Sequence, residues 1–235
     1  LWKDVWANVP VSEVPITSIT NGVHTKTWMA PEFSALYTKY LGAWEEHLTE
    51  PDFWRRVIDI PDAQLWDTHQ KLKLRLVEFV RERVRAQRQR IGESPESIRG
   101  VNHILDPEIL TIGFARRFAT YKRGALLFSD RERLHRLLND TARPVQFILA
   151  GKAHPQDEGG KALIQEVYKF SRESGLENRI VFVEDYDTYI ARRLVKGVDL
   201  WLNNPLRPWD ASGTSGMKLQ PNGGLTLRCL DGRWR

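Results

Sequence analysis

The chain has 235 residues, of which 41% are hydrophobic and 28% are charged, as is typical of a soluble globular protein with at least one sizeable domain. No apolar run approaches the length of a membrane span, and the first ten residues mix charge with tryptophan, which excludes a signal peptide there. A single cysteine, Cys229, excludes an internal disulfide and fits a reducing cytoplasm.

The positive charge is concentrated in one segment. Residues 71–90 hold eight basic and two acidic side chains, so the rest of a chain with a net charge of +5 is close to neutral. Apolar residues recur there at helical spacing, at Leu72, Leu76, Phe79, Val80 and Val84. The pattern predicts an amphipathic helix with a solvated basic face, which we favour over a nucleic-acid or membrane surface.

The first 105 residues are mainly helical in pattern and rich in tryptophan. Prolines divide them into short helices and turns, at Pro31, Pro51, Pro61 and Pro95. We therefore predict a helical connecting segment over residues 1–105, followed by a different unit over residues 106–235.

From residue 106 short apolar runs alternate with helical patterns. Strands are predicted at residues 109–115, 145–150, 179–184, 198–202 and 225–229. Helices are predicted at residues 122–138, 160–173 and 188–196, with another starting near Gly213. This alternation predicts an α/β fold with a parallel sheet and flanking helices. Ligands of such sheets bind beyond the carboxyl ends of the strands, which here are the loops at residues 116–121, 151–158, 185–187 and 203–215.

The loop that begins at Arg116 gathers four cations. Arg116, Arg117, Lys122 and Arg123 lie between a predicted strand and a predicted helix. A solvated helix start is the simpler interpretation, but cations are unfavourable there because that end of a helix dipole is already positive. Because arginine binds phosphate in bidentate fashion, we favour an anion site.

The loop over residues 210–218 is rich in small residues and ends in a lysine. Small residues let the backbone approach a ligand, and successive N–H groups form an anion nest. Lys218 lies about one helical turn after Thr214 on the same side. The loop is no P-loop, because no Gly-Lys pair is followed by Ser or Thr.

Two further loops carry weaker signals. His154 follows the second predicted strand, and a lone histidine is more often structural than catalytic. No second His or Cys lies at ligand spacing, so we predict no metal site. Residues 184–186, Glu-Asp-Tyr, end the third strand and could aim a phenol or a carboxylate at the same cleft.

Five sequence blocks together resemble the α-glucan phosphorylases, which act on glycogen, starch or maltodextrin. The family motif Glu-Ala-Ser-Gly-Thr-Gly-Asn-Met-Lys is similar to residues 210–218, where Ala211, Ser212, Gly213, Thr214, Met217 and Lys218 match. The other blocks are residues 20–23 with Trp28, 116–123, 150–155 and 184–186, in the order of the family. Asp210 for Glu and Ser-Gly for Gly-Asn are closer to the short bacterial and archaeal branch.

The resemblance implies the C-terminal, Rossmann-like domain of a two-domain glycosyltransferase of the GT-B type. It implies phosphorolysis of terminal α-1,4-glucosidic bonds, dependent on pyridoxal 5'-phosphate (PLP), which releases glucose 1-phosphate with retention. A retaining hydrolase would need two carboxylates about 5 Å apart, and these loops offer no obvious pair. In the family the PLP phosphate acts beside the substrate phosphate, and two adjacent phosphates share a proton near neutral pH.

The resemblance also implies a role for each matched residue. Lys218 would hold PLP and form the catalytic set with Arg117 and Lys122, which would bind inorganic phosphate or the phosphate of glucose 1-phosphate. The remaining contacts to PLP would come from Arg116, Thr214, Ser215, Tyr186 and Trp28. The hydroxyls of the α-glucan would be held by Asn21, Asp210, Ala211, Ser212 and Gly213.

Several features depart from the family pattern. Ala119 and Thr120 replace His-Glu, which removes hydrogen bonds, and Asp210 is one methylene shorter than Glu. The chain starts at Leu1 rather than Met, so we expect a fragment truncated at both ends and inactive without the N-terminal domain. For the full-length protein the family implies a cytoplasmic homodimer with neither a nucleic-acid nor a membrane partner.

Two alternatives remain open. A nucleotide-sugar glucosyltransferase such as a glycogen synthase also grips a phosphate with a cation pair, but it would not need Lys218 after a Ser/Gly/Thr loop. A non-catalytic glucan-binding relic could use some of the nine tryptophans as sugar platforms. Most of them lie among apolar neighbours, so core packing is the favoured interpretation.

Overall fold

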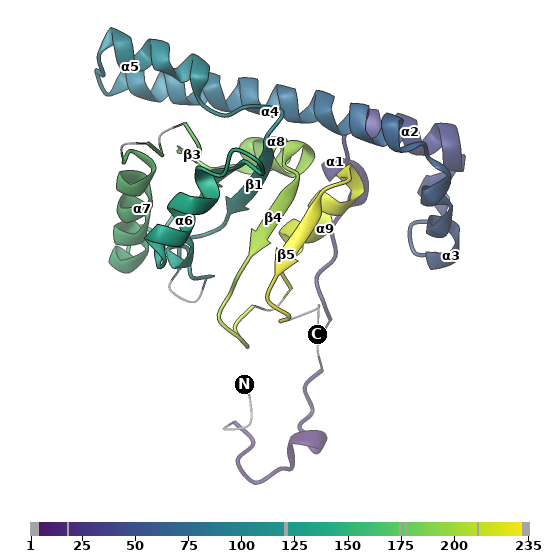
Figure 1. The fold of residues 1–235 in the computed structure, drawn as a ribbon. Coiled ribbons are helices and arrows are strands. Elements are labelled where there is room, and N and C mark those ends of the chain that lie inside the picture. Colours follow the sequence, from purple (N-terminus) through teal and green to yellow (C-terminus); the bar gives the residue numbers. More distant parts are fainter. Residues whose placement is uncertain are drawn as a thin grey trace.

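A five-stranded parallel sheet forms the centre of the computed structural model, which describes residues 5–17, 19–119, 122–173, 175–176, 178–210 and 212–231 (Figure 1). Its strands are β1 Leu110–Ala115, β2 Val145–Ala150, β3 Ile180–Val183, β4 Leu200–Asn203 and β5 Leu225–Arg228. Each predicted strand agrees to within two residues at either end, so the predicted α/β fold is confirmed.

The strand order is β3-β2-β1-β4-β5, with every neighbouring pair parallel. The chain builds outward from β1 to β3, then crosses back and pairs β4 with the other side of β1. This order is that of Rossmann-like folds, in which the direction of building reverses beside the first strand. The loops after β1 and β4 therefore diverge at this switch point and leave room for a ligand between them.

Two cores cover the two faces of the sheet. Along β2, Phe147 and Leu149 join a core with residues of α6 and α7, whereas Ile148 joins one with residues of α4 and α8. Successive side chains of a strand point to opposite faces, and burial on both explains why β2 is apolar almost throughout. The helices involved are α4 Asp62–Arg90, α6 Arg131–Leu138, α7 Glu158–Ser171 and α8 Thr188–Gly197.

Aspartates start three of these helices. The carboxylates of Asp130, Asp157 and Asp187 each accept a hydrogen bond from a backbone N–H three residues later, at 2.8 to 2.9 Å. Such caps satisfy amides that have no partner within the helix. They explain why α7 begins two residues before the predicted start at Gly160.

The prediction of one helix over residues 122–138 is wrong in its first half. Arg123 has a φ of +49°, and among residues 123–130 the regular structure before α6 is a 3-10 turn, Leu126–Phe128. The Arg123 side chain donates to the carbonyl oxygens of Asn204 and Pro205, at 2.8 and 3.0 Å. These contacts tie the segment to the loop after β4, and they override its local helical propensity.

Within its described residues, the N-terminal part contains five α-helices, and all but the first begin at or just after a proline. They are α1 Thr25–Trp28, α2 Pro31–Leu41, α3 Pro51–Trp54, α4 and α5 Pro95–Gly100. Proline suits the first helical turn, because its missing N–H would have no partner there. The prediction of short helices is wrong for α4, whose 29 residues run across one end of the sheet (Figure 1). The division after residue 105 stays a prediction.

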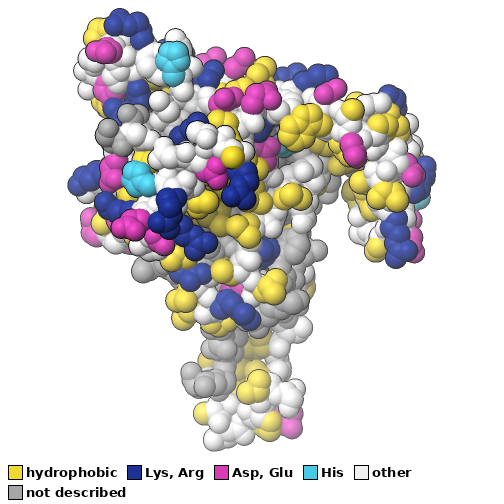
Figure 2. Space-filling view, viewed as in Figure 1, with side chains coloured by type: hydrophobic (Ala, Val, Ile, Leu, Met, Phe, Trp, Pro, Cys, Tyr) yellow, Lys and Arg dark blue, Asp and Glu magenta, His cyan; other side chains and the backbone are white. Residues whose placement is uncertain are grey.

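Many cations of α4 are engaged within the molecule. Arg75, Arg88 and Arg90 form ion pairs with Glu32, Glu93 and Glu184, and Arg81 donates to the carbonyl oxygens of Ile104 and Leu105. Figure 2 shows acidic side chains interspersed with basic ones over this upper part of the molecule. The interspersed charges favour a solvated face over a continuous anion-binding surface. None of the described helices has the length and apolar character needed to cross a membrane.

Trp44 and Trp54 of the helical part pack into a third core, whereas Trp28 packs against the core of α4 and α8. Trp44 is 1% exposed, and its ring lies 6.1 Å from that of Tyr37 and 6.2 Å from that of Trp54. Trp66 and Trp209 are exposed. The preference for core packing is therefore confirmed for Trp44, while Trp209 lies at the candidate site described below.

A pair of adjacent glycines provides a test of how α7 packs on the loop after β1. A Cβ on Gly160 would lie 2.4 Å from the Phe118 carbonyl oxygen, whereas one on Gly159 would approach only Asp157 Oδ1, at 3.5 Å. We expect Gly160→Ala to lower the free energy of unfolding by about 1–3 kcal/mol through overpacking. Gly159→Ala, the matched control, should raise it by up to about 1 kcal/mol. Thermal unfolding of both variants checks the pair, and equal effects would contradict this close approach.

Candidate active site at the carboxyl ends of β1 and β4

A pocket of about 500 Å³ lies at the switch point of the sheet. Its walls come from the end of β1 and the loop after it, the loop after β4, the residues after β3 and the N-terminal segment. The lining residues are Asn21, Ala115, Arg116, Arg117, Lys122, Tyr186, Trp209, Asp210, Ser212, Gly213, Thr214 and Ser215. The fold thus brings together ten of the residues that the sequence marked as candidates.

Asp210 is the centre of the polar contacts in this pocket. Its Oδ1 accepts hydrogen bonds from Lys122 Nζ at 2.5 Å and Arg116 at 3.1 Å, and its Oδ2 accepts one from Asn203 Nδ2 at 3.3 Å. Only 3% of Asp210 is exposed. Burial alone would raise its pKa, but the hydrogen bond from Lys122 and the charges of Arg116 and Lys122 hold the pKa below the usual 3.8. Asp210 is therefore an anion at neutral pH.

The cations of the pocket outnumber its carboxylate. Arg116 and Lys122 are largely buried beside Asp210, and Arg117 lines the mouth with an exposed side chain. Three cations around one carboxylate leave a positive pocket, in which an anion is stabilised more strongly than in water. The geometry therefore suits a phosphate group, as the predicted cation loop requires.

Gly213 lets the backbone of the loop after β4 pass close to these side chains. Its φ is +65°, and a Cβ there would lie 3.0 Å from Asn203 Nδ2 and 3.2 Å from Asp210 Oδ2. Only glycine combines this left-handed conformation with so little space. The helix α9, Thr214–Leu219, begins with the next residue and carries Lys218 in its last turn.

Lys218 lies beside the pocket without lining it. Its Nζ is 4.0 Å from the centroid of the Trp28 ring, a cation–π contact between α9 and α1. Burial lowers the pKa of the Lys218 amine from its usual 10.5. A lowered pKa increases the neutral, nucleophilic fraction of an amine at neutral pH.

The chemistry of these residues fits PLP. The amine of Lys218 can condense with an aldehyde, the Trp28 and Tyr186 rings pack against the same core beside it, and the cations suit a phosphate. Tyr186 lines the pocket, and burial followed by the charge of Asp187 raises its pKa above 10. The phenol therefore stays neutral and can donate a hydrogen bond.

Other predicted candidates lie apart from this pocket or cannot be placed. Ala211 and Thr120 fall outside the described residues. His154 Nδ1 accepts a hydrogen bond from the Gln156 N–H within its own turn, at 3.2 Å, which fits the structural role preferred for it. Within the part of the chain that the structure describes, no group of three His, Cys, Asp or Glu side chains could hold a metal ion.

Three residues that make contacts at this site were not among the predicted site residues, although Asn203 begins one of the four predicted ligand loops. Asn203 ends β4 and donates to Asp210, while Asp231 is fully buried and accepts a hydrogen bond from the Asp210 N–H at 3.0 Å. Arg228 ends β5 and donates to the Asp231 carbonyl oxygen at 3.3 Å. The signal that could have identified them is their place at the carboxyl ends of β4 and β5, the same edge as the cation loop.

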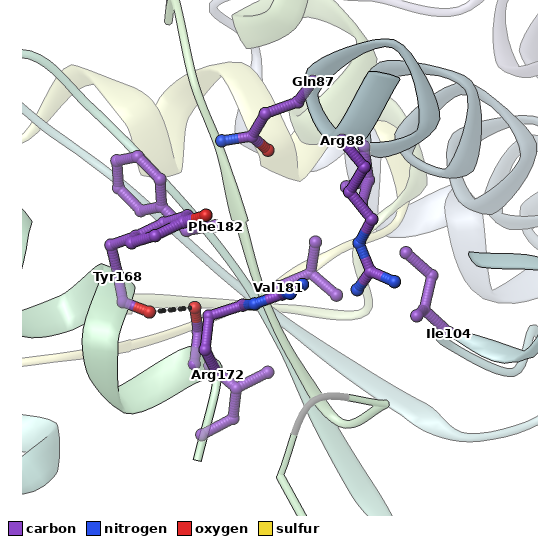
Figure 3. A pocket seen from close by; sticks show the side chains of 10 residues that line it. Gln87, Arg88, Ile104, Tyr168, Arg172, Val181 and Phe182 are labelled. Carbon is purple, nitrogen blue, oxygen red and sulfur yellow. Dashed lines mark hydrogen bonds between the residues drawn. The ribbon is translucent and has the colours of Figure 1, made fainter. Parts of the chain in front are cut away.

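A much smaller cavity of about 20 Å³ lies elsewhere, where α4, α7 and β3 meet (Figure 3). Figure 3 shows Arg88 and Arg172 beside Val181, with Tyr168 and Phe182 opposite. Both arginines form ion pairs with Glu93, and Arg88 also donates to the Ser97 carbonyl oxygen at 2.6 Å. With room for little more than one water molecule, this cavity belongs to the packing between helices.

The strand order defines an α/β unit of the Rossmann type. The cationic pocket at its switch point, with a half-buried lysine beside it, is suited to bind an anion. The family model for carbohydrate phosphorylases matches residues 9–233. The chain therefore belongs to the carbohydrate phosphorylase family.

Similar proteins agree with this family. The chain is 44% identical to a maltodextrin phosphorylase of Thermococcus litoralis over 236 residues, which cover 100% of this chain and 28% of that protein. It is 46% identical to a glycogen phosphorylase of Mycobacterium tuberculosis (100% of this chain, 27% of that protein) and to one of Aquifex aeolicus (94% and 32%). The chain thus spans between a quarter and a third of the length of these relatives.

Proposed function

We propose that the full-length protein is an α-glucan phosphorylase, which cleaves terminal α-1,4-glucosidic bonds with inorganic phosphate and releases glucose 1-phosphate with retention. The observation that carries this proposal is the cluster of Arg116, Lys122 and Asp210 at the switch point, beside the half-buried amine of Lys218. PLP, held by Lys218, is its cofactor. We further propose a cytoplasmic homodimer that acts on α-glucan without a nucleic-acid or membrane partner.

In this proposal the cations divide between two phosphate groups. Arg116, Thr214 and Ser215 hold the phosphate of PLP, and Arg117 and Lys122 hold the substrate phosphate. When bound, PLP supplies a phosphate that shares a proton with the substrate phosphate near neutral pH. Arg117, Lys122 and Lys218 are thus the proposed catalytic residues, and the positive pocket makes two adjacent anions tolerable.

The sugar is proposed to lie against the loop after β4. Asn21, Ser212 and Gly213 line the pocket together with Asp210 and are proposed to bind hydroxyls. Ala211, which lies outside the described residues, is proposed as a further contact on the resemblance alone. Among the described lining residues Asp210 is the only carboxylate, so a hydrolase with two carboxylates at the reacting bond lacks its second group here. Because Lys122 and Arg116 already hold Asp210, an incoming phosphate must share these cations with it.

The proposal is tested by incubating the full-length protein with PLP, reducing with borohydride and mapping the labelled peptide. A pyridoxyl group on Lys218 is the expected result. A folded protein with no adduct in excess PLP would overturn the proposal and favour a nucleotide-sugar glucosyltransferase or a glucan-binding relic.

The isolated chain of residues 1–235 should not phosphorolyse maltodextrin, because the other wall of the cleft is expected to come from an N-terminal domain.

Arg117 provides a prediction that separates phosphate binding from stability. Its side chain is exposed at the pocket, so we expect Arg117→Ala to leave unfolding unchanged. Loss of one charge-assisted hydrogen bond should raise the KM for phosphate about tenfold or more. Lys152→Ala is the matched control, because Lys152 is an exposed cation on the neighbouring loop that does not line the pocket. Initial rates at varied phosphate check both variants, and equal KM values would contradict the assignment.

A further inference from the structure

One buried amide connects the candidate cofactor lysine to the ring that covers it. Asn222 ends the 3-10 turn Gln220–Asn222, directly after α9, and is 1% exposed. Its Nδ2 donates to the carbonyl oxygens of Lys218 and Trp28, both at 3.0 Å, and of Val195 at 3.2 Å. Its Oδ1 accepts a hydrogen bond from the Ala30 N–H at 2.7 Å. The amide thus joins α9 to α8 and to the α1–α2 junction.

The side chains of two of these residues, Lys218 and Trp28, are also in contact. The backbones of Lys218 and Trp28 are held by the same Asn222 amide, and the Lys218 amine lies on the Trp28 ring. A second contact supports the arrangement, because the Tyr37 hydroxyl donates to the Pro221 carbonyl oxygen at 3.1 Å. The same amide therefore holds the two backbone positions from which the amine and the ring project.

We propose that Asn222 is a positioning residue for Lys218: its amide fixes the lysine backbone against that of Trp28 and so keeps the amine on the ring and shielded from water. The inference rests on the proposed function, because it gives Lys218 the role of the cofactor lysine. It goes further by assigning the shielding of that amine to a residue that itself touches neither the amine nor the pocket.

The physical reason is that orientation and desolvation both control the reactivity of an amine. An amine held in one position loses less entropy when it condenses with an aldehyde. Shielding from water favours its neutral form, in line with the lowered pKa of Lys218. Without the amide, three carbonyl groups and one N–H each lose a hydrogen bond, and the link between α1 and α9 is weakened.

The test compares Asn222→Leu with Gln146→Leu in the full-length protein. Gln146 is the matched control: it is fully buried, its amide bonds to Asp106 and Thr111, and it lies away from the pocket. Both variants lose the hydrogen bonds of a buried side-chain amide, so the free energy of unfolding should fall in both. The readout is the PLP concentration for half-maximal trapping of pyridoxyl on Lys218 by borohydride, measured where circular dichroism shows folded protein.

We expect Asn222→Leu to raise that concentration about tenfold, which corresponds to about 1.4 kcal/mol, and Gln146→Leu to change it less than twofold. The pH midpoint of trapping should also rise toward 10.5 in Asn222→Leu alone, because its amine is hydrated. Asn222→Ser, which keeps one hydroxyl donor, replaces the leucine variant if that variant does not fold.

A wild-type protein without an adduct would overturn the proposed function and this inference together. A normal wild-type adduct with equal values in the Asn222 and Gln146 variants would overturn the inference alone.

Discussion

Lys218→Arg in the full-length protein is expected to abolish the borohydride-reducible PLP adduct and to lower phosphorolysis at least about a hundredfold. A guanidinium preserves the positive charge and can stay on the Trp28 ring, but it remains protonated at every accessible pH and cannot condense with an aldehyde. The substitution therefore separates the covalent role of the amine from its charge. Peptide mapping after reduction and initial rates with maltodextrin and phosphate are the measurements.

Lys196→Arg is the control for this experiment. Lys196 is another half-buried lysine whose pKa is lowered by burial and then by the charge of Arg192, but it lies on α8 away from the pocket. We expect this variant to keep both the adduct on Lys218 and the activity. An adduct on Lys196, or activity that survives in Lys218→Arg, would show that a depressed pKa rather than the site decides where PLP binds.

The same lysine should weaken the fold. The pKa of Lys218 is lower in the folded state than in the unfolded chain, so the unfolded state binds the proton more tightly. The charged amine therefore opposes folding at neutral pH, and this penalty disappears as the pH rises through the folded pKa toward 10.5. In the absence of PLP, Lys218→Met should raise the urea midpoint of unfolding, since methionine can still pack on Trp28. A fall in the midpoint would contradict the penalty.

Asp199→Asn is expected to lower the free energy of unfolding by about 3–5 kcal/mol, more than Gly160→Ala. Asp199 Oδ2 lies 2.8 Å from Lys73 Nζ, and its Oδ1 lies 2.7 Å from His69 Nε2. Lys73 is 2% exposed, so the amide of asparagine would leave a buried ammonium without its counter-charge. The Thr111 N–H also donates to Asp199, at 2.6 Å, so the carboxylate joins α4 to the amino ends of β1 and β4.

Hydrogen exchange of the amides in β1 and β4 measures this loss as a free energy of local opening. The double variant Lys73→Met with Asp199→Asn should recover most of it, because replacing both charges of a buried pair is often nearly neutral. Asp52→Asn, which removes an exposed ion pair with Arg55, should change nothing measurable. A double variant as unstable as the single one would show that the contact matters through shape rather than charge.

The same carboxylate predicts an acid dependence. Burial would raise the pKa of Asp199, but hydrogen bonds from His69, Lys73 and the Thr111 amide outweigh it and hold the pKa below the usual 3.8. A depressed folded-state pKa adds stability above pH 3.8, and this stability is lost as the pH falls through the folded value. Asp199→Asn should therefore show a weaker dependence of stability on pH below 4 than the wild-type protein.

Much of the sheet and of the anion pocket could be predicted from sequence. The strand at residues 145–150 is correct at both ends, because a run buried on both faces must be apolar throughout. The sequence predicts that the cations after β1 and the small residues after β4 share one site, because parallel strands bring their carboxyl ends to one edge. The helix predicted from residue 122 failed, because the Arg123 contacts to Asn204 and Pro205 are tertiary.

The sequence by itself determined the α/β class, the strand boundaries and the loops that carry charge, because each depends on periodicity or on neighbours within a few residues. Only the tertiary structure decided that Asp210 forms ion pairs with both Lys122 and Arg116, and that the Trp28 ring covers Lys218. Asn222 is 194 positions from Trp28 and was not marked as a site residue. Contacts between such distant residues leave no local pattern, because the packing of α1 against α8 and α9 alone brings them together.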